Sequence, residues 1–237
     1  MDALSGHPRL WPSISLPGIV VGRGTYWTLD LDALPPVEAL LDGSLAWLLD
    51  TPIQRGSLAE DPDERAVRDA SAPELATIVG DGILSPAFRR FIEDPEPRQH
   101  IRSATACYLD LGQFPVKVGD GCQVIHFLSD QQWVLHWLLF VGADGSERVV
   151  TTPRPLGFDT GEGAPIREVD ASSPEASLAV CGDSFERFLY HYWAMNELFF
   201  RVAWEKRAID ALPADLRAYA EKYPRHASEY DIFVNER

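Results

Sequence analysis

The amino-acid sequence predicts an α+β fold in which a twisted, mainly antiparallel sheet, arranged as a β-meander, is packed by N-terminal and C-terminal helices. Residues 122–152 hold three apolar runs separated by a polar turn at 129–132 and a Gly-Asp loop at 142–146, which is the pattern of consecutive antiparallel strands. Residues 184–200 follow with apolar side chains at helical spacing, and a similar segment precedes the strands at 73–92. With 46% apolar residues among 237, the chain can fill the core of one large domain.

Residues 1–60 are predicted to form an N-terminal extension that packs on the core. They contain two short strands, at 18–21 and 25–31, and a helix over 35–50 whose start is marked by two prolines, since proline fits the first turn of a helix. Residues 61–72 mix acids, arginines and proline with few apolar side chains, so we expect an acidic, solvated connector. Three aromatic residues of the extension are interpreted either as core or as anchors of an interface: Trp11, Tyr26 and Trp27.

The main domain is predicted to span 73–210, and 211–237 to form a C-terminal helical tail. The domain opens with a helix, a turn at two glycines and a short second helix, because the apolar spacing breaks at the glycines and then resumes. Short strands at 106–111 and 114–118 precede the meander, and a short edge strand at 166–170 follows a loop rich in Pro and Gly.

The central strand of the meander is predicted to be apolar on both faces. Trp133, Leu135 and Trp137 alternate on one face, while Leu138 and Phe140 lie on the other. A strand of this kind sits in the middle of a sheet that is covered on both sides. We therefore expect helices on one side and another part of the chain, such as the N-terminal extension, on the other.

The aromatic helix at 184–200 is predicted to start at Asp183 as the N-cap, with Glu186 completing a capping box. Its core-facing side is formed by Phe185, Phe188, Tyr192 and Phe199 with Trp193 beside them, and they pack on the central strand. The opposite side, which includes Arg187, Tyr190 and Ala194, is expected to face water.

Four residues of this helix are the candidate binding residues. His191 and Glu197 fall at the borders of the solvated side, Trp193 flanks the core-facing side, and Asn196 lies near the middle of that side. A buried, unpaired amide costs about 1–3 kcal/mol, so Asn196 needs partners. It either contacts a ligand or bonds to the backbone of a neighbouring loop or strand, and we favour the second interpretation.

The segment "SFERFLYHYWAMNELFF" after a sheet resembles the terminal helix of the SUKH superfamily of bacterial toxin-immunity proteins and a fungal cell-wall-synthesis regulator. "ELATIVGDGILSPAFRRFI" is similar to the family's opening helix, turn and short aromatic helix, although Ser85 interrupts the usual Leu-Pro pair. "HFLSDQQWVLHWLLFVGADGSERVV" is similar to the strands of one bacterial branch. The resemblance covers about residues 73–205.

This resemblance implies a SUKH-like, non-enzymatic protein-binding module, with no catalytic residues to carry over and a surface that binds a partner. In bacterial members it implies neutralisation of a toxin, often a nuclease or a nucleic-acid deaminase, with a basic substrate site. The chain's formal net charge of -15 suits a basic partner and disfavours direct binding of nucleic acid. The alternative is an intracellular adaptor or a small-ligand-sensing regulatory protein, in which His191, Asn196 and Glu197 face a pocket.

An enzyme is the third hypothesis, and its most concrete form is a zinc site built from His126, His136, Cys122 and Asp130. Strand register decides whether the two histidines meet: they point to opposite faces if the turn has two residues and share a face if its length is odd. Even on one face, two histidines without a third ligand nearby are more often hydrogen-bonded core groups. We therefore predict no metal, no cofactor and no catalytic residues.

Other features narrow the function classes. No phosphate-binding or dinucleotide-binding glycine motif is present in the sequence. Three scattered cysteines fit reduced thiols better than disulfides, and no apolar run approaches the roughly 20 residues of a spanning helix. We expect a soluble, cytoplasmic protein without membrane contact, and the oligomeric state and the partner's identity stay open.

Overall fold

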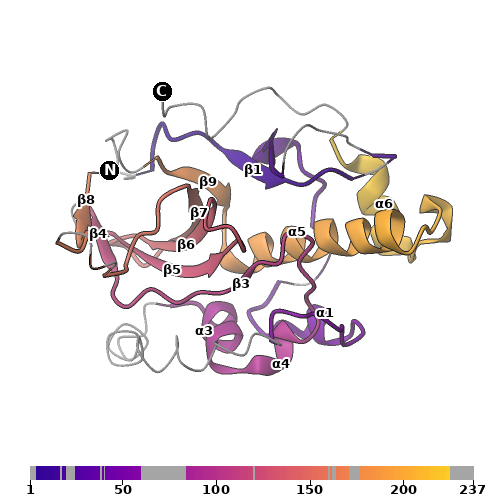
Figure 1. The fold of residues 1–237 in the computed structure, drawn as a ribbon, viewed down its shortest axis with the longest axis horizontal. Helices are drawn as coiled ribbons and strands as arrows, with labels where there is room; N and C mark the ends of the chain where they lie inside the picture. The colour runs from indigo at the N-terminus through magenta and orange to yellow at the C-terminus, as the bar shows by residue number, and fades with distance from the viewer. Residues whose placement is uncertain are drawn as a thin grey trace.

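The predicted meander forms the middle of a mixed sheet in a computed structural model of the chain (Figure 1). The sheet order is β8-β4-β5-β6-β7-β9, and β3 pairs with the end of β5. All pairs are antiparallel except β4 with β8. The strands of this sheet are β3 (Tyr108–Leu109), β4 (Val116–Val118), β5 (Gln123–Ser129), β6 (His136–Val141), β7 (Glu147–Thr152), β8 (Glu168–Val169) and β9 (Ala179–Gly182).

Helices and a separate two-stranded ribbon surround this sheet. The structure describes residues 4–16, 18–19, 25–37, 39, 41–59, 84–119, 121–159, 161, 164–170 and 177–224. The α+β class predicted from the sequence is thereby confirmed. The remaining elements are β1 (Leu10–Ser13), β2 (Trp27–Asp30), η1 (Leu31–Ala33), α1 (Ala46–Leu49), α3 (Pro86–Glu93), α4 (Pro95–Arg98), α5 (Phe185–Leu198), η2 (Phe199–Trp204), η3 (Ile209–Ala211) and α6 (Ala214–Lys222).

Local signals explain where α3 and α5 begin. The Ser85 hydroxyl accepts a hydrogen bond from the Phe88 backbone N–H, and Pro86 occupies the first turn of α3. At α5 the N-cap is Ser184, whose hydroxyl accepts from Arg187 N–H. The prediction of Asp183 as N-cap was therefore wrong by one residue, and no capping box forms.

The two acids predicted for that capping box bond to distant segments instead. The Glu186 carboxylate accepts hydrogen bonds from Gly43 N–H at 2.8 Å and from the Trp47 indole at 3.0 Å. Asp183 pairs with Arg9 at 3.0 Å. Both acids thus tie the N-terminal segment to the start of α5.

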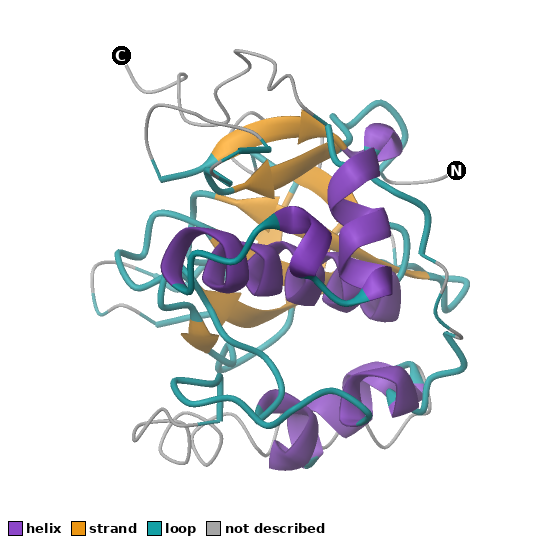
Figure 2. Ribbon diagram, turned by 90° about the vertical axis from the view of Figure 1, so that its right-hand side faces the viewer, coloured by secondary structure: helices purple, strands orange, loops and turns teal. Residues whose placement is uncertain are grey.

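Every residue of α5 except Arg187, which is exposed as predicted, is buried, and the sequence pattern did not predict burial on so many sides. Tyr190 and Ala194, expected to face water, are both buried. The N-terminal segment covers part of this side, because the Trp47 ring lies 5.1 Å from Tyr190 and the Trp11 ring 5.8 Å from His191 at its border. Helix α6 covers another part through Tyr219. Seen from the right-hand side of Figure 1, one group of helices stands in front of the strands and another lies below them (Figure 2).

The N-terminal segment differs from its prediction in two places. Its first strand is β1, which pairs with β2 along its length. Of the strand predicted at 18–21, residues 18–19 form a turn and residues 20–21 lie outside the described residues. The predicted helix at 35–50 shortens to the single turn of α1. The predicted connector at 61–72 and the predicted first helix after residue 73 lie outside the described residues.

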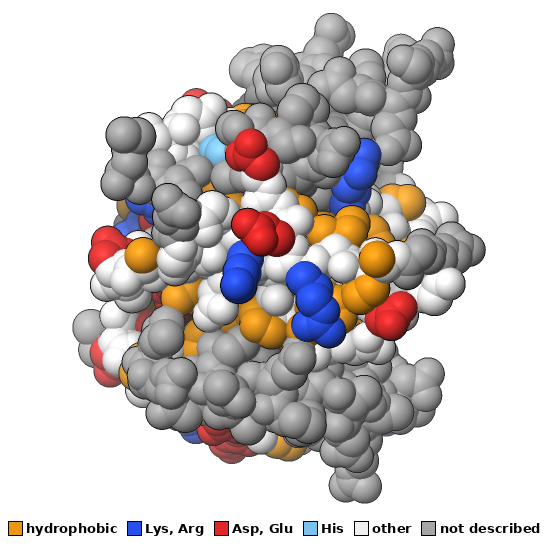
Figure 3. Space-filling view, turned by 90° about the vertical axis from the view of Figure 1, so that its left-hand side faces the viewer, with side chains coloured by type: hydrophobic (Ala, Val, Ile, Leu, Met, Phe, Trp, Pro, Cys, Tyr) orange, Lys and Arg blue, Asp and Glu red, His pale blue; other side chains and the backbone are white. Residues whose placement is uncertain are grey.

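The edge of the sheet at β4 and β8 is short and charged. Lys117 of β4 lies opposite Glu168 of β8, and both are exposed. Charged residues on a short edge strand discourage pairing with other chains. Figure 3 shows this end of the molecule, where hydrophobic, basic and acidic side chains are interspersed.

None of the helices in the described ranges has the length and apolar character that crossing a bilayer requires.

Candidate functional site

Asn196, one of the predicted binding residues, is buried and bonded within the chain. Its side-chain oxygen accepts a hydrogen bond from Ala104 N–H at 2.7 Å, and its amide donates to the Tyr192 carbonyl at 2.9 Å. These contacts agree with the structural interpretation, in which Asn196 bonds to the backbone of a neighbouring loop.

Glu197 and His191 are also buried and bonded internally, not placed at the border of a solvated face. Arg102 binds both Glu197 carboxylate oxygens, at 3.0 and 3.1 Å, and Arg201 binds the same group at 2.9 Å. The Nδ1 atom of His191 lies 2.7 Å from the Tyr219 hydroxyl. Burial, and then the charge of Arg187, lower the pKa of His191 to about 4, so the imidazole is neutral near pH 7.

Trp193 packs in the aromatic layer between α1 and α5. Its ring lies 5.8 Å from Trp47 and 5.8 Å from Tyr190. Its indole N–H has no hydrogen-bond partner among the described residues. The four predicted binding residues therefore belong to the packed interior around α5, and their contacts do not favour the ligand-pocket hypothesis.

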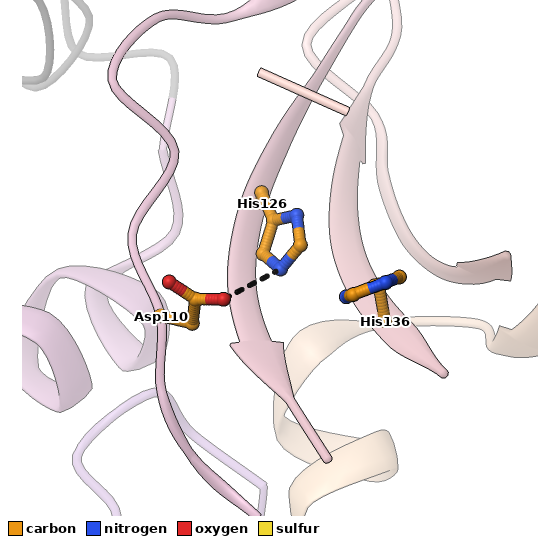
Figure 4. A group of neighbouring side chains, drawn as sticks. All are labelled: Asp110, His126 and His136. Carbon is orange, nitrogen blue, oxygen red and sulfur yellow. Dashed lines mark ion pairs between the residues drawn. The ribbon is translucent and has the colours of Figure 1, made fainter. Parts of the chain in front are cut away.

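A second polar cluster is built on β5, β6 and the residue after β3, and it contains Asp110, His126, Ser129 and His136, all buried. The two histidines come from β5 and β6, and their rings lie 5.0 Å apart. Asp110 follows β3 directly, and its Oδ2 atom lies 3.7 Å from the Nε2 atom of His126 (Figure 4). We call this group the Asp-Ser-His-His cluster.

A bulge in β5 brings the two histidines to one face, which resolves the question left open by the sequence. Ser129 lies opposite His136, and Leu128 lies opposite Trp137. The register then shifts between His126 and Leu128, so that His126 lies opposite Leu138. One extra residue in a strand reverses the faces of the residues beyond it. Without the bulge, His126 would point away from His136.

Ser129 is the centre of this cluster. Its hydroxyl oxygen lies 2.6 Å from Asp110 Oδ2, 2.8 Å from His126 Nε2 and 2.8 Å from His136 Nδ1. The other nitrogen of His126, Nδ1, lies 3.1 Å from the Leu156 carbonyl. The Nε2 atom of His136 is buried and has no hydrogen-bond partner in the described part of the chain.

Burial keeps both imidazoles of the cluster neutral near pH 7. Desolvation, followed by repulsion from His136, lowers the pKa of His126 well below its usual value. Desolvation also lowers the pKa of His136 to about 4. Neutral imidazoles offer lone pairs, and together with a carboxylate they are the donor set that binds Zn²⁺ and related ions.

Two aromatic rings cover the cluster on the side of the β5–β6 loop. The Trp133 indole N–H donates to the Tyr108 hydroxyl at 2.6 Å and to Asp110 Oδ2 at 3.2 Å. Its ring lies 5.6 Å from His136, edge to face. Phe158 lies 4.7 Å from His126 and 5.6 Å from Trp133. Trp133 was predicted as core, but 40% of its surface is exposed, because the loop ends only at Leu135.

The zinc hypothesis from the sequence named two members of this cluster and missed two. Of the other proposed ligands, Asp130 caps the loop by accepting from Val134 N–H and Leu135 N–H. Cys122 precedes β5 at the end remote from the loop and is absent from the cluster. No sequence pattern marked Asp110 or Ser129 as a site residue, because a single Asp or Ser after an apolar run is common.

Comparisons of this chain with protein-family models, with curated proteins and with solved structures found no match. The resemblance to the SUKH superfamily therefore stays a prediction.

Proposed function

We propose that this chain is a non-enzymatic protein-binding module of the immunity type, which neutralises a basic toxin of the nuclease or deaminase class by presenting the β5–β6 loop to it. The loop, residues 130–135, is called the hairpin tip below. The observation that carries the proposal is the conformation and exposure of Trp133 at this tip.

Trp133 is held in an unfavourable backbone conformation and still exposed. Its φ angle is 58°, a left-handed value that costs a residue with a Cβ atom about 1–2 kcal/mol. Strained residues of this kind concentrate at functional sites, where the surrounding structure enforces them. Val134, the next residue, is 42% exposed as well, so the tip presents two adjacent apolar side chains to solvent.

The tip is also rigid, which lowers the entropy cost of binding. Asp130 fixes the backbone by accepting from Val134 N–H at 2.8 Å and Leu135 N–H at 3.1 Å, and its carbonyl accepts from Trp133 N–H at 3.0 Å. The two indole hydrogen bonds described above fix the ring. A preorganised tryptophan is the residue type that most often dominates the binding energy of a protein interface.

The charge of the chain supports a basic partner. Acids exceed Lys and Arg by 36 to 21. A net charge of this sign speeds association with a basic protein, and the rate falls as salt is added. A basic substrate cleft in a nuclease or deaminase is such a surface, which is also what the SUKH resemblance implies.

The test has two parts. The purified chain is used to capture the protein encoded by the neighbouring gene, and cells that express that protein are tested for protection by this chain. We expect binding that weakens with salt, and we expect Trp133→Ala to weaken it by at least about 2 kcal/mol, or about 30-fold. Trp204→Ala is the matched control, because Trp204 lies in η2 and is 75% exposed. Thermal unfolding of both variants shows whether they remain folded.

Two results would contradict the proposal. One is the absence of both capture and protection by the wild-type chain. The other is equal binding by the Trp133→Ala and wild-type proteins, which would leave the hairpin tip without a role in recognition.

A further inference from the structure

We propose that the Asp-Ser-His-His cluster binds one divalent transition-metal ion, preferably Zn²⁺. The ligands of the ion would be Asp110 Oδ2, His126 Nε2 and a ring nitrogen of His136. The inference goes beyond the proposed function, because the hairpin tip could bind a partner with or without an ion beneath it. It rests on the kind of donor atoms in the cluster, on the distances between them and on the contact behind His126.

The cluster brings together lone pairs that a cation can share. A carbonyl can only accept, so His126 donates from Nδ1 to Leu156, and Nε2 of the neutral ring is then an acceptor. Asp110 Oδ2, also an acceptor when ionised, faces the same point and accepts hydrogen bonds from the Ser129 hydroxyl and the Trp133 indole. A carboxylate oxygen and an imidazole nitrogen are ligand atoms of Zn²⁺, so an ion between them would replace their hydrogen bonds with Ser129.

The spacing of the donor atoms suits a small metal ion. One ligand atom each from Asp110, His126 and His136 lies within 4.8 Å of the others, and the Asp110–His126 distance is 3.7 Å. Bonds of about 2.0–2.1 Å at tetrahedral angles place ligand atoms about 3.4 Å apart. A small inward movement of these side chains is therefore enough to form the site.

The contact behind His126 is typical of a metal ligand. A histidine that binds a metal through one nitrogen usually donates the other N–H to a carbonyl or carboxylate, which fixes the ring and its tautomer. The contact between His126 Nδ1 and the Leu156 carbonyl has this form. It leaves Nε2 directed at Asp110 and Ser129.

Ser129 has to give way for the ion to bind. Its hydroxyl oxygen lies 2.6–2.8 Å from each of the three other side chains, which is shorter than the spacing around a tetrahedral ion. Rotation of the Ser129 side chain about its Cα–Cβ bond would clear the centre of the cluster. The rings of Trp133 and Phe158 cover the cluster, and Trp133 is 40% exposed, so entry of an ion requires the Trp133 ring to leave its hydrogen bonds with Tyr108 and Asp110 for a time.

The test is titration of the chelator-treated, folded protein with ZnCl₂ by calorimetry, followed by metal analysis after desalting. We expect one equivalent of Zn²⁺ per chain. Co²⁺ in its place is expected to give the intense visible absorption of a tetrahedral nitrogen and oxygen site. Loss of a residue that only supports a metal ligand lowers metal affinity by about 10–100-fold. Asp110→Asn and His136→Gln remove ligands themselves, so each should lower the affinity for Zn²⁺ by more than that.

Three matched variants localise the ion. Ser129→Ala should retain one equivalent, because Ser129 is not a ligand, and His191→Asn should retain it because that buried histidine lies in α5. Cys122→Ser should also retain it, because the thiol lies outside the cluster. Circular dichroism establishes that each variant is folded.

Less than one equivalent of Zn²⁺ in the wild-type protein would overturn the proposal, and this result does not depend on any variant. The proposal would also be overturned if folded Asp110→Asn and His136→Gln still took up Zn²⁺, or if Cys122→Ser no longer did. Either result would place the ion outside the cluster. Loss of uptake in folded Ser129→Ala would overturn the assignment of the ligands.

Discussion

We predict that acid destabilises the folded chain through His191, because this imidazole is buried in the folded state. Burial depresses the pKa of this imidazole to about 4, whereas its ordinary value, which applies in the unfolded chain, is 6.5. Above pH 6.5 the His191 imidazole is neutral in both the folded and the unfolded state, so its burial does not reduce the free energy of unfolding. Between pH 6.5 and 4 the unfolded state binds one more proton than the folded state, so the free energy of unfolding falls as the pH falls.

The size of the effect follows from the pKa difference. At about 1.4 kcal/mol per pKa unit, the gap between 6.5 and about 4 corresponds to about 3 kcal/mol in full. The isoelectric point of the sequence is about 4.7, and proteins are least soluble near that pH. Measurements therefore stop near pH 5, where about 2 kcal/mol of the effect has accumulated.

The measurement is urea unfolding followed by circular dichroism at a series of pH values, for the wild type and for His191→Asn. Asparagine keeps a polar atom near the position of Nδ1 but does not titrate. The difference between the two free energies of unfolding isolates His191, because the other histidines are common to both proteins. We expect this difference to shrink by about 2 kcal/mol between pH 7 and pH 5.

Tyr219→Phe is the control, because it removes the hydrogen-bond partner and leaves the imidazole in place. This variant should be less stable at every pH but should keep the slope of the wild type. A wild-type minus His191→Asn difference that stays constant from pH 7 to pH 5 would refute the argument, since it would mean that the buried ring takes up a proton as easily as the unfolded one.

Three substitutions test the packing around α5. Asn196→Leu should lower the free energy of unfolding by about 1–3 kcal/mol and leave partner binding intact; lost binding in a stable variant would instead make Asn196 a ligand contact. Glu197→Gln should cost about 1–3 kcal/mol in thermal or urea unfolding, because it removes the buried carboxylate that pairs with Arg102 and Arg201 and leaves Arg102 only its pair with Glu205; a neutral effect would contradict that role. Gly182→Ala should cost about 1–3 kcal/mol, since the added Cβ would lie 2.7 Å from Phe188 Cβ, and a neutral effect in the same assay would show that α5 can shift.

Much of the fold could be predicted from the sequence because the signals are local. The alternation of apolar residues and the polar turns predicted β5, β6 and β7, and helical spacing predicted α5. The short aromatic helix after Ser85 was also predicted, and it forms α3 with its aromatic residues buried. Pairing between neighbouring strands follows from the length of the loops that join them.

The surroundings of α5 could not be predicted from its own pattern. Periodicity shows that a helix has an apolar side, but whether its other side faces water depends on what packs there. Here the N-terminal segment, α6 and the loop after α4 that carries Arg102 cover it, so His191 and Glu197 lie in the interior and bond to Tyr219 and Arg102. The sequence indicated that these groups need partners and did not indicate which.

The sequence by itself determined the class of fold, the order of its central strands and the acidity of its surface, because each depends on composition or on spacing along the chain. Only the tertiary structure decided that His126, His136 and Asp110 meet around Ser129. A single bulge in β5 turns His126 to the face of His136, and such a change of register leaves no mark in hydrophobic periodicity. The length of the β5–β6 loop, which ends only at Leu135, leaves Trp133 40% exposed and not in the core.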